Sequence, residues 1–217
     1  MNARERAETI ARYDARLDEF GETEQALGWG PKGRSRLRYE ILLSRWDLSG
    51  ATVIDFGCGF GDLYSAIVAK NWNVDYIGVD LNSRLLDVAS KRYPGVRFEL
   101  GDLSVLDSLA PVDYVLTSGV FNHLLADNRA FVTQAFERFD GVARRGFSSN
   151  FLSSYVDFPL DHTYHSKPEE ILALAYRFSR NVVLRNDYMP FEFTVFVDKA
   201  AGVDSRLTVY EDYVRYV

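Results

Sequence analysis

Hydrophobic positions along this chain follow two alternating periodicities, and their order predicts an α/β fold. Short apolar runs that end at turn residues are typical of buried strands, whereas apolar residues at every third or fourth position indicate helices. The runs predict strands near residues 52–56, 75–80, 96–100, 112–118 and 142–149, and helical patterns fall near 62–70, 83–92, 104–109 and 127–139. This alternation favours a mostly parallel sheet with helices on both faces.

The first part of the chain precedes this alternation and carries a helical pattern. Apolar residues at helical spacing predict a helix over residues 2–20, and a second helical pattern covers residues 35–46 after a loop rich in glycine and proline. We expect residues 1–49 to form a helical lid over a core of residues 50–198, within a single domain that spans residues 1–217.

One long connection separates the fifth strand from a helix predicted over residues 168–177, where Pro168 and two acidic residues mark the start. A loop of this length inside a compact domain is more often functional than not. It carries polar and aromatic side chains at Tyr155, Asp157, His162, Tyr164 and His165. We expect it to complete the lid.

Composition narrows the class of protein. The chain has 47% hydrophobic and 26% charged residues, which is typical of a globular protein, and its net charge of −6 disfavours a nucleic-acid partner. A basic stripe or a solvated helix face could be formed by Lys32, Arg34, Arg36 and Arg38. No apolar run is long enough to span a bilayer and no signal-peptide core is present, so we expect a cytoplasmic protein with no membrane partner.

The glycine-rich turn after the first strand is the most informative motif. Glycines stand at positions 57, 59 and 61, Asp55 precedes them, and Asp80 ends the next strand 23 residues after Gly57. Glycines let a ligand approach the backbone closely, and an acidic residue at the end of the second strand is placed to bind a ribose diol. The pattern indicates a nucleoside-cofactor site.

Asp62 decides which cofactor fits better. It occupies the position of the third glycine in the dinucleotide fingerprint, where its carboxylate would repel a pyrophosphate. A cofactor with a cationic amine and no phosphate, such as S-adenosylmethionine, suits the loop better. An NAD-dependent oxidoreductase is the alternative.

The chain resembles the class I S-adenosylmethionine-dependent methyltransferases in an ordered set of four motifs. These motifs are similar to residues 53–61, 77–80, 98–103 and 112–121 of this chain. The resemblance covers roughly residues 50–198 and implies a seven-stranded sheet that closes with an antiparallel hairpin of residues 182–185 and 191–197. It also implies cofactor contacts from Asp55, Gly57, Cys58, Gly59, Asp80, Leu81, Asp102, Leu103, Ser118 and Gly119.

Catalytic candidates are less well defined, because methyl transfer requires mainly that the nucleophile be oriented and sometimes deprotonated. His123 follows the fourth-strand loop and is a candidate base with a pKa near neutrality, with a surface histidine as the alternative. His162 and Tyr155 are the further candidates. His162, His165 and Asp157 could instead bind a metal or make ordinary loop hydrogen bonds.

Further residues are candidates for the pocket wall and for charge recognition. Tyr13, Tyr155, Tyr164 and Trp29 are aromatic candidates for the wall. Arg36 and Lys32 are candidates to bind the cofactor carboxylate or an acidic substrate, with a solvated face as the alternative.

Taken with the resemblance, these residues predict an S-adenosylmethionine-dependent methyltransferase that acts on oxygen or nitrogen of a small molecule, as a monomer or homodimer. One alternative is an enzyme that uses the same pocket for elimination, cyclisation or decarboxylation. A binding protein whose pocket has lost its ligand is another.

Overall fold

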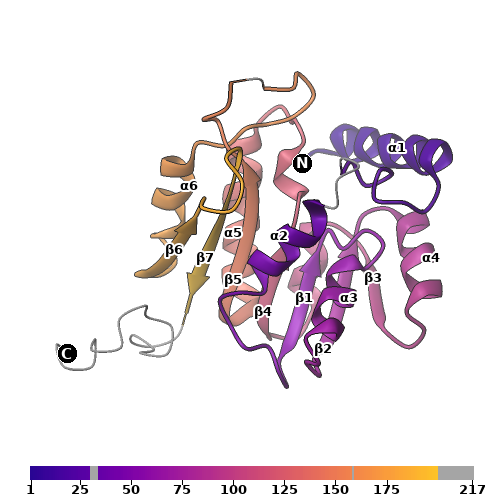
Figure 1. Ribbon diagram of the computed structural model, residues 1–217, viewed down its shortest axis with the longest axis horizontal. Helices are drawn as coiled ribbons and strands as arrows, with labels where there is room; N and C mark the ends of the chain where they lie inside the picture. The colour runs from indigo at the N-terminus through magenta and orange to yellow at the C-terminus, as the bar shows by residue number, and fades with distance from the viewer. Residues whose placement is uncertain (30–33, 158, 200–217) are drawn as a thin grey trace.

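A single seven-stranded sheet organises the computed structural model, which describes residues 1–29, 34–157 and 159–199, without the side chain of Arg34 (Figure 1). The strand order is β3-β2-β1-β4-β5-β7-β6. The strands are β1 (Thr52–Phe56), β2 (Asp75–Asp80), β3 (Arg97–Leu100), β4 (Val112–Thr117), β5 (Ala143–Leu152), β6 (Asn181–Arg185) and β7 (Glu192–Asp198). Strands β1 to β5 pair in parallel, and β7 runs antiparallel to both β5 and β6. The predicted fold class, including the closing hairpin, is confirmed.

Helices occupy the predicted segments, with two differences. The helices are α1 (Ala3–Phe20), α2 (Arg34–Leu42), α3 (Asp62–Ala69), α4 (Ser83–Arg92), α5 (Asn128–Val142) and α6 (Pro168–Ala175), with 3-10 turns η1 (Leu103–Ser108) and η2 (Val120–Asn122). The helix expected near 104–109 is present, but this short connection before β4 forms a 3-10 helix and not an α-helix. The second N-terminal helix ends at Leu42, and Trp46 packs separately in the core.

Both faces of the sheet are covered, because neighbouring residues of a strand point to opposite faces. Ile54 and Val115 pack with the buried face of α5 in one hydrophobic cluster. Val53 and Tyr114 pack on the other face with residues of α2 and α3. Helices therefore cover the two faces, and the ends of the strands are left for a site.

A cluster of phenylalanine rings fills the layer between β5 and α5. Phe136 is fully buried, and its ring meets Phe147 edge to face with ring centroids 5.1 Å apart. Phe121 and Phe151 stack beside them at 5.1 Å. Such pairs add to the free energy gained from burial of the rings. This packing fixes β5 and the loop that follows β4, and both help to form the site.

Helix α1 lies across the end of the sheet above α4, as Figure 1 shows. The side-chain amide of Asn82 donates to Asp14 at 2.9 Å, and Arg84 pairs with Asp18 at 2.6 Å. Apolar residues of α1 pack on Leu85 and Val88 of α4. This position, over the carboxyl ends of β1 and β2, is the place expected for the helical lid. None of the helices in the described ranges is long and apolar enough to cross a membrane.

Replacement of Phe136 by alanine tests the aromatic layer. We expect a loss of about 3 to 5 kcal/mol in the free energy of unfolding, because the cavity cannot collapse among rigid rings. Chemical denaturation measures it. Val68→Ala on α3 is the control, since Val68 is 50% exposed and should change stability by less than about 0.5 kcal/mol. Equal losses in the two variants would contradict the packing argument.

Candidate functional site

The glycine loop of residues 57–61 joins β1 to α3 at the carboxyl edge of the sheet. The backbone N–H groups of Gly57 and Cys58 donate to the carbonyl oxygen of Val79 at 2.7 and 3.0 Å, so the loop is fastened to β2. Gly57 has φ of +80°, and a Cβ atom there would lie 2.2 Å from Cγ2 of Val120. Only glycine fits this position, where the loops after β1 and β4 approach each other.

Cys58 lies within this loop as a buried, uncharged side chain. Its Sγ would be 2.9 Å from a Cβ atom built on Gly78, so the thiol packs against β2. Burial raises the pKa of the Cys58 thiol well above its usual value, and nearby carboxylates raise it further. A thiolate nucleophile is therefore disfavoured.

Asp80 holds the end of β2 to the glycine loop. One carboxylate oxygen accepts from the N–H of Gly59 at 2.9 Å, and the other accepts from the N–H of Asn82 at 2.9 Å. Burial raises the pKa of Asp80, and these backbone hydrogen bonds oppose the shift. Leu81 follows it and lines the same cavity.

Asp55 is a second buried carboxylate and stands at the end of β1. Only 2% of its surface is exposed, and it accepts a hydrogen bond of 2.6 Å from the hydroxyl of Tyr76. Burial raises the pKa of Asp55 to about 7, against the lowering by the Tyr76 hydroxyl, and Asp80 and Asp62 raise it further. A cation placed beside Asp55 would favour its charged form.

Asp102 and Leu103 follow β3 and start the next part of the wall. The carboxylate of Asp102 accepts from the N–H and hydroxyl of Ser104, at 2.9 and 2.7 Å, which holds its pKa below the usual value. Arg6 of α1 also pairs with Asp102 at 2.9 Å. A residue of the segment expected to form the lid thus contacts a side chain that the sequence assigned to the cofactor.

The loop after β4 is held by a residue that the sequence reasoning missed. The side chain of Asn150, on β5, accepts from the N–H of Gly119 at 2.9 Å and donates to the hydroxyl of Ser118 at 3.0 Å. Asn150 is 31 residues from Gly119 and only 1% exposed. The fifth strand also carries Ser148 and Ser149 beside it, so no signal in the sequence distinguishes Asn150.

All ten residues predicted to contact the cofactor line one cavity of about 640 Å³. This volume is within the usual range for sites that enclose small molecules. The N-terminal part contributes wall residues from α1 and from the segment before α2, and the loop after β5 contributes Leu160, His162 and Thr163. Both segments expected to form the lid therefore reach the cavity.

The chain matches the methyltransferase domain family over residues 54–144. A relative from Mycobacterium tuberculosis, named "Putative methyltransferase Rv1506c", is 31% identical over 157 residues, which are 69% of this chain and 94% of the relative. The chain belongs to the S-adenosylmethionine-dependent methyltransferase family. S-adenosylmethionine is accordingly the cofactor of this methyltransferase.

More distant similarities agree with this assignment. The trans-aconitate 2-methyltransferase of Rhizobium etli is 27% identical over 164 residues, which are 72% of this chain and 60% of the relative. The structure of magnesium protoporphyrin IX methyltransferase from Synechocystis PCC 6803, solved with bound S-adenosylhomocysteine, covers 89% of this chain and all of that chain at 16% identity and a TM-score of 0.65. At that identity, the second similarity shows the fold alone.

Two residues that line the methyltransferase cavity each carry a buried N–H donor without a partner among the described residues, Nη1 of Arg38 and Nε1 of Trp29. Arg38 is only 6% exposed. Its Nε donates to Glu192 at 2.7 Å, its Nη2 also donates to Glu192, and its guanidinium lies 4.4 Å from the ring centroid of Trp29. Buried donors are nearly always satisfied, so this pair suits the carboxylate of the cofactor's methionine portion.

Of the two charged candidates from the sequence, Arg36 matches the alternative of a solvated face. Arg36 points to solvent and pairs with Glu40 at 3.2 Å, and it does not line the cavity. Lys32 lies outside the described residues. A surface stripe that includes Arg38 is also wrong, because Arg38 is buried against Glu192 of β7.

His123 lies in the cavity wall, but its pKa is not near neutrality. Burial lowers the pKa of His123 to about 4, and Arg12, His162 and Arg16 lower it further by charge repulsion. Its Nδ1 is 3.0 Å from Nη1 of Arg12, and its Nε2 is 2.7 Å from the hydroxyl of Tyr13. Because Arg12 can only donate, Nδ1 accepts and Nε2–H donates to Tyr13. Its role as a base stays a prediction, and a free ring nitrogen is not available in this arrangement.

The remaining candidates separate into two groups. His162 and Tyr13 line the cavity, whereas Tyr155 and Tyr164 are not among its lining residues. Tyr155 is 69% exposed, and its hydroxyl donates to Glu169 at 3.2 Å. Its position therefore gives no support to its predicted catalytic role, which stays untested.

The loop histidines form no metal centre in the part of the chain that is described. His165 contacts the hydroxyl of Thr163 at 2.9 Å and the carbonyl oxygen of Ser153 at 2.8 Å. Across residues 1–29, 34–157 and 159–199, no group of three His, Cys, Asp or Glu side chains is placed to hold a metal ion. These contacts match the alternative of loop hydrogen bonds.

The raised pKa of Asp55 predicts a pH-dependent stability. Because the folded protein retains the Asp55 proton up to about pH 7, whereas an unfolded chain loses it near pH 4, this group costs stability as pH rises between those values. We compare the free energy of unfolding of Asp55→Asn with that of the natural protein. We expect the difference to grow in favour of Asp55→Asn by on the order of 2 to 4 kcal/mol as pH rises from 5 to 8.

Chemical denaturation at both pH values checks this prediction without the cofactor. Asp75→Asn is the matched control, since Asp75 is an exposed carboxylate at the other end of β2. Parallel pH profiles for Asp55→Asn and the natural protein would contradict the raised pKa.

The Nη1 atom of Arg38, which has no partner in the described parts of the chain, predicts that Arg38 contacts the carboxylate of the cofactor. Arg38→Lys keeps a positive charge beside Glu192 but cannot also present a second fixed N–H group to the cavity. We expect the Kd for S-adenosylhomocysteine to rise about tenfold, or about 1.4 kcal/mol. Titration calorimetry measures it. Methylthioadenosine, which lacks the amino-acid portion, is the matched control ligand, and an equal loss for both ligands would contradict the assignment.

Proposed function

We propose that this methyltransferase moves the methyl group of S-adenosylmethionine to an oxygen or nitrogen atom of a small molecule. The observation that carries the proposal is one cavity of about 640 Å³ whose wall includes the predicted cofactor residues, helix α1 and the loop after β5. Because the expected lid and the predicted cofactor residues line the same cavity, the space beside the cofactor suits an acceptor of modest size. A net charge of −6 also favours a small molecule over a nucleic acid.

The relatives lend support to a small acceptor. Several are trans-aconitate 2-methyltransferases, and the chain spans between about a quarter and 60% of their length. Structures with this fold also include a small RNA methyltransferase, at 16% identity, so the fold by itself does not select the acceptor. The acceptor class therefore rests on the cavity.

In the proposed reaction, the acceptor's lone pair forms a bond to the methyl carbon, while the electron pair of the carbon–sulfur bond returns to the sulfur of the cofactor. The protein's contribution is to hold the acceptor in line with that bond and to exclude water. Ser118 and Gly119, which Asn150 holds in place, line the cavity and precede His123 in the sequence. His162 is an exposed ring on the cavity wall and is the better-placed candidate to take a proton.

A methyl-transfer assay tests the proposal. Purified protein is incubated with S-adenosylmethionine that carries a labelled methyl group and with a panel of carboxylic acids, phenols and amines, trans-aconitate among the acids. We expect label in one class of small molecule, and its loss in Asp80→Ala, because the glycine loop loses the carboxylate that fastens it.

Two further reactions complete the assay. Cellular RNA and a protein extract are offered in parallel, and label in either of them alone would contradict the proposal. Incubation with S-adenosylhomocysteine, which has no methyl group to donate, separates methylation from elimination, cyclisation or decarboxylation. Consumption of an acceptor with S-adenosylhomocysteine would support the non-methylating alternative.

A further inference from the structure

The lid side of the cavity carries two arginines that have no carboxylate partner among the described residues. Arg12 and Arg16 both lie on α1 and both line the cavity. The contact recorded for the Arg12 guanidinium is Nδ1 of His123, which is a neutral acceptor. Arg16 donates to the backbone carbonyl oxygens of Gln25 and Ala26. Neither guanidinium is neutralised within the described parts of the chain.

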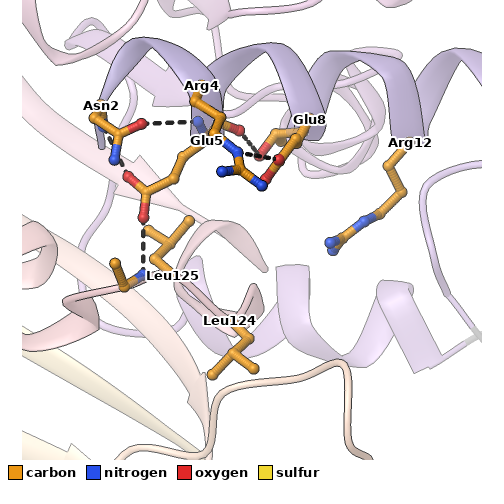
Figure 2. Close-up of a pocket in the computed structure, with 9 residues that line it drawn as sticks. Asn2, Arg4, Glu5, Glu8, Arg12, Leu124 and Leu125 are labelled. Carbon is orange, nitrogen blue, oxygen red and sulfur yellow. Dashed lines mark hydrogen bonds and ion pairs between the residues drawn. The ribbon is translucent and has the colours of Figure 1, made fainter.

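The other arginines of α1 are paired, which makes the contrast specific. Arg4 pairs with Glu8 at 2.7 Å, and Arg6 pairs with Asp102 at 2.9 Å. Glu8 stands one turn before Arg12, yet Figure 2 shows the Glu8 carboxylate bonded to Arg4 while Arg12 extends away from the helix. Glu5, the other acid nearby, is held by the N–H groups of Asn2 and Ala126. The acidic side chains of this helix face are therefore engaged elsewhere.

His123 holds Arg12 toward the cavity. Its lowered pKa has Arg12, His162 and Arg16 among its causes, which places several positive or protonatable groups around one ring. The facing groups are Tyr13 on the same helix as Arg12, and His162 on the loop after β5. A negative charge bound among these groups would relieve their mutual repulsion.

The cofactor does not account for this charge. It has one carboxylate, and Arg38 and Trp29, which lie outside α1 and also line the cavity, carry two buried donors without a partner among the described residues that suit it. Asp55 and Asp80 stand on the cofactor side of the cavity, where they suit a ligand with cationic groups. A second anion, on the side of α1, is best explained as part of the acceptor.

We propose that Arg12 and Arg16 form a carboxylate-binding subsite for the methyl acceptor, which is therefore a small organic acid. This inference rests on the proposed function, because it assumes that the acceptor occupies this cavity. Arg12 is the principal donor, since within the described ranges its guanidinium has no contact other than the one to His123. Arg16 adds charge and also anchors the segment of residues 25–26 through its backbone contacts.

Binding to the protein loaded with S-adenosylhomocysteine tests the subsite without any turnover. The carboxylic acids of the panel and their neutral methyl esters are titrated by calorimetry into the natural protein and into Arg12→Gln. We expect at least one acid to bind, its ester to bind at least tenfold more weakly, and its Kd to rise about tenfold or more in Arg12→Gln. Arg12→Lys should recover part of the affinity, because it restores the charge without the planar fork.

Arg4→Gln is the matched control, since Arg4 lies on the same helix, is paired with Glu8 and does not line the cavity. An unchanged Kd for S-adenosylhomocysteine in Arg12→Gln shows that the fold and cofactor site are intact. A second readout is the His123 ring, whose pKa should rise in NMR titrations when the acid binds, from its low value of about 4.

Several results would overturn the subsite. These are failure of every acid to bind, equal affinity for acids and esters, tighter binding of inorganic phosphate than of any acid, or equal losses in Arg12→Gln and Arg4→Gln. The proposed function fails separately. If a phenol or amine is methylated and Arg12→Gln leaves its KM unchanged, the subsite is contradicted but the proposed small-molecule methyltransferase is not. If label appears in RNA or protein alone, the proposed function itself is contradicted.

Discussion

The attachment of the glycine loop to the end of β2 is the constraint on which the site depends. Asp80 accepts one N–H from the loop and one from the start of α4, so a single buried carboxylate fixes two backbone segments. The main-chain bonds to Val79 fasten the loop a second time. The positive φ of Gly57 then lets the loop after β4 approach without a clash with Val120. These contacts are made by backbone or by buried groups of the protein itself, so the glycine loop is held in place without a contact from a ligand.

Acidic and basic side chains lie on different elements around the cavity, a separation that the net charge of the chain does not show. The sheet edge presents Asp55 and Asp80, both buried, with pKa values raised by burial. The lid presents Arg12 and Arg16, although the chain as a whole is acidic. A cationic cofactor and an anionic acceptor would each meet the opposite charge, and each would reduce the repulsion among the groups around it. Each ligand would then increase the affinity for the other, and by the same factor in both directions.

The sequence was sufficient for the features that are local. The strands, the glycine loop and Asp80 could be predicted because strand periodicity, glycine spacing and the distance to the next strand lie within about 30 residues. The lowered pKa of His123 could not be predicted, since it depends first on burial and then on the charge of Arg12, which is 111 residues away. Arg38 was missed for the same reason: its partner Glu192 is 154 residues distant, and in the sequence it resembles Arg36, which is exposed. Periodicity shows which residues share a helix face, but it does not show which face another element will cover.

The Arg38–Glu192 pair links parts of the chain that are far apart in sequence. Arg38 belongs to α2, in the N-terminal part, and Glu192 begins β7, in the closing hairpin. Both side chains are nearly inaccessible to solvent, so removal of either would leave a buried charge without its partner. A buried ion pair is weak support for stability by itself, but here it leaves Nη1 of Arg38 without a partner among the described residues and holds the guanidinium over the ring of Trp29. Trp29 in turn packs against Gly119, where a Cβ atom would lie 2.6 Å from the indole ring. The closing hairpin thus holds Arg38, a residue of the cavity wall, through Glu192, so the far edge of the sheet is connected to the site.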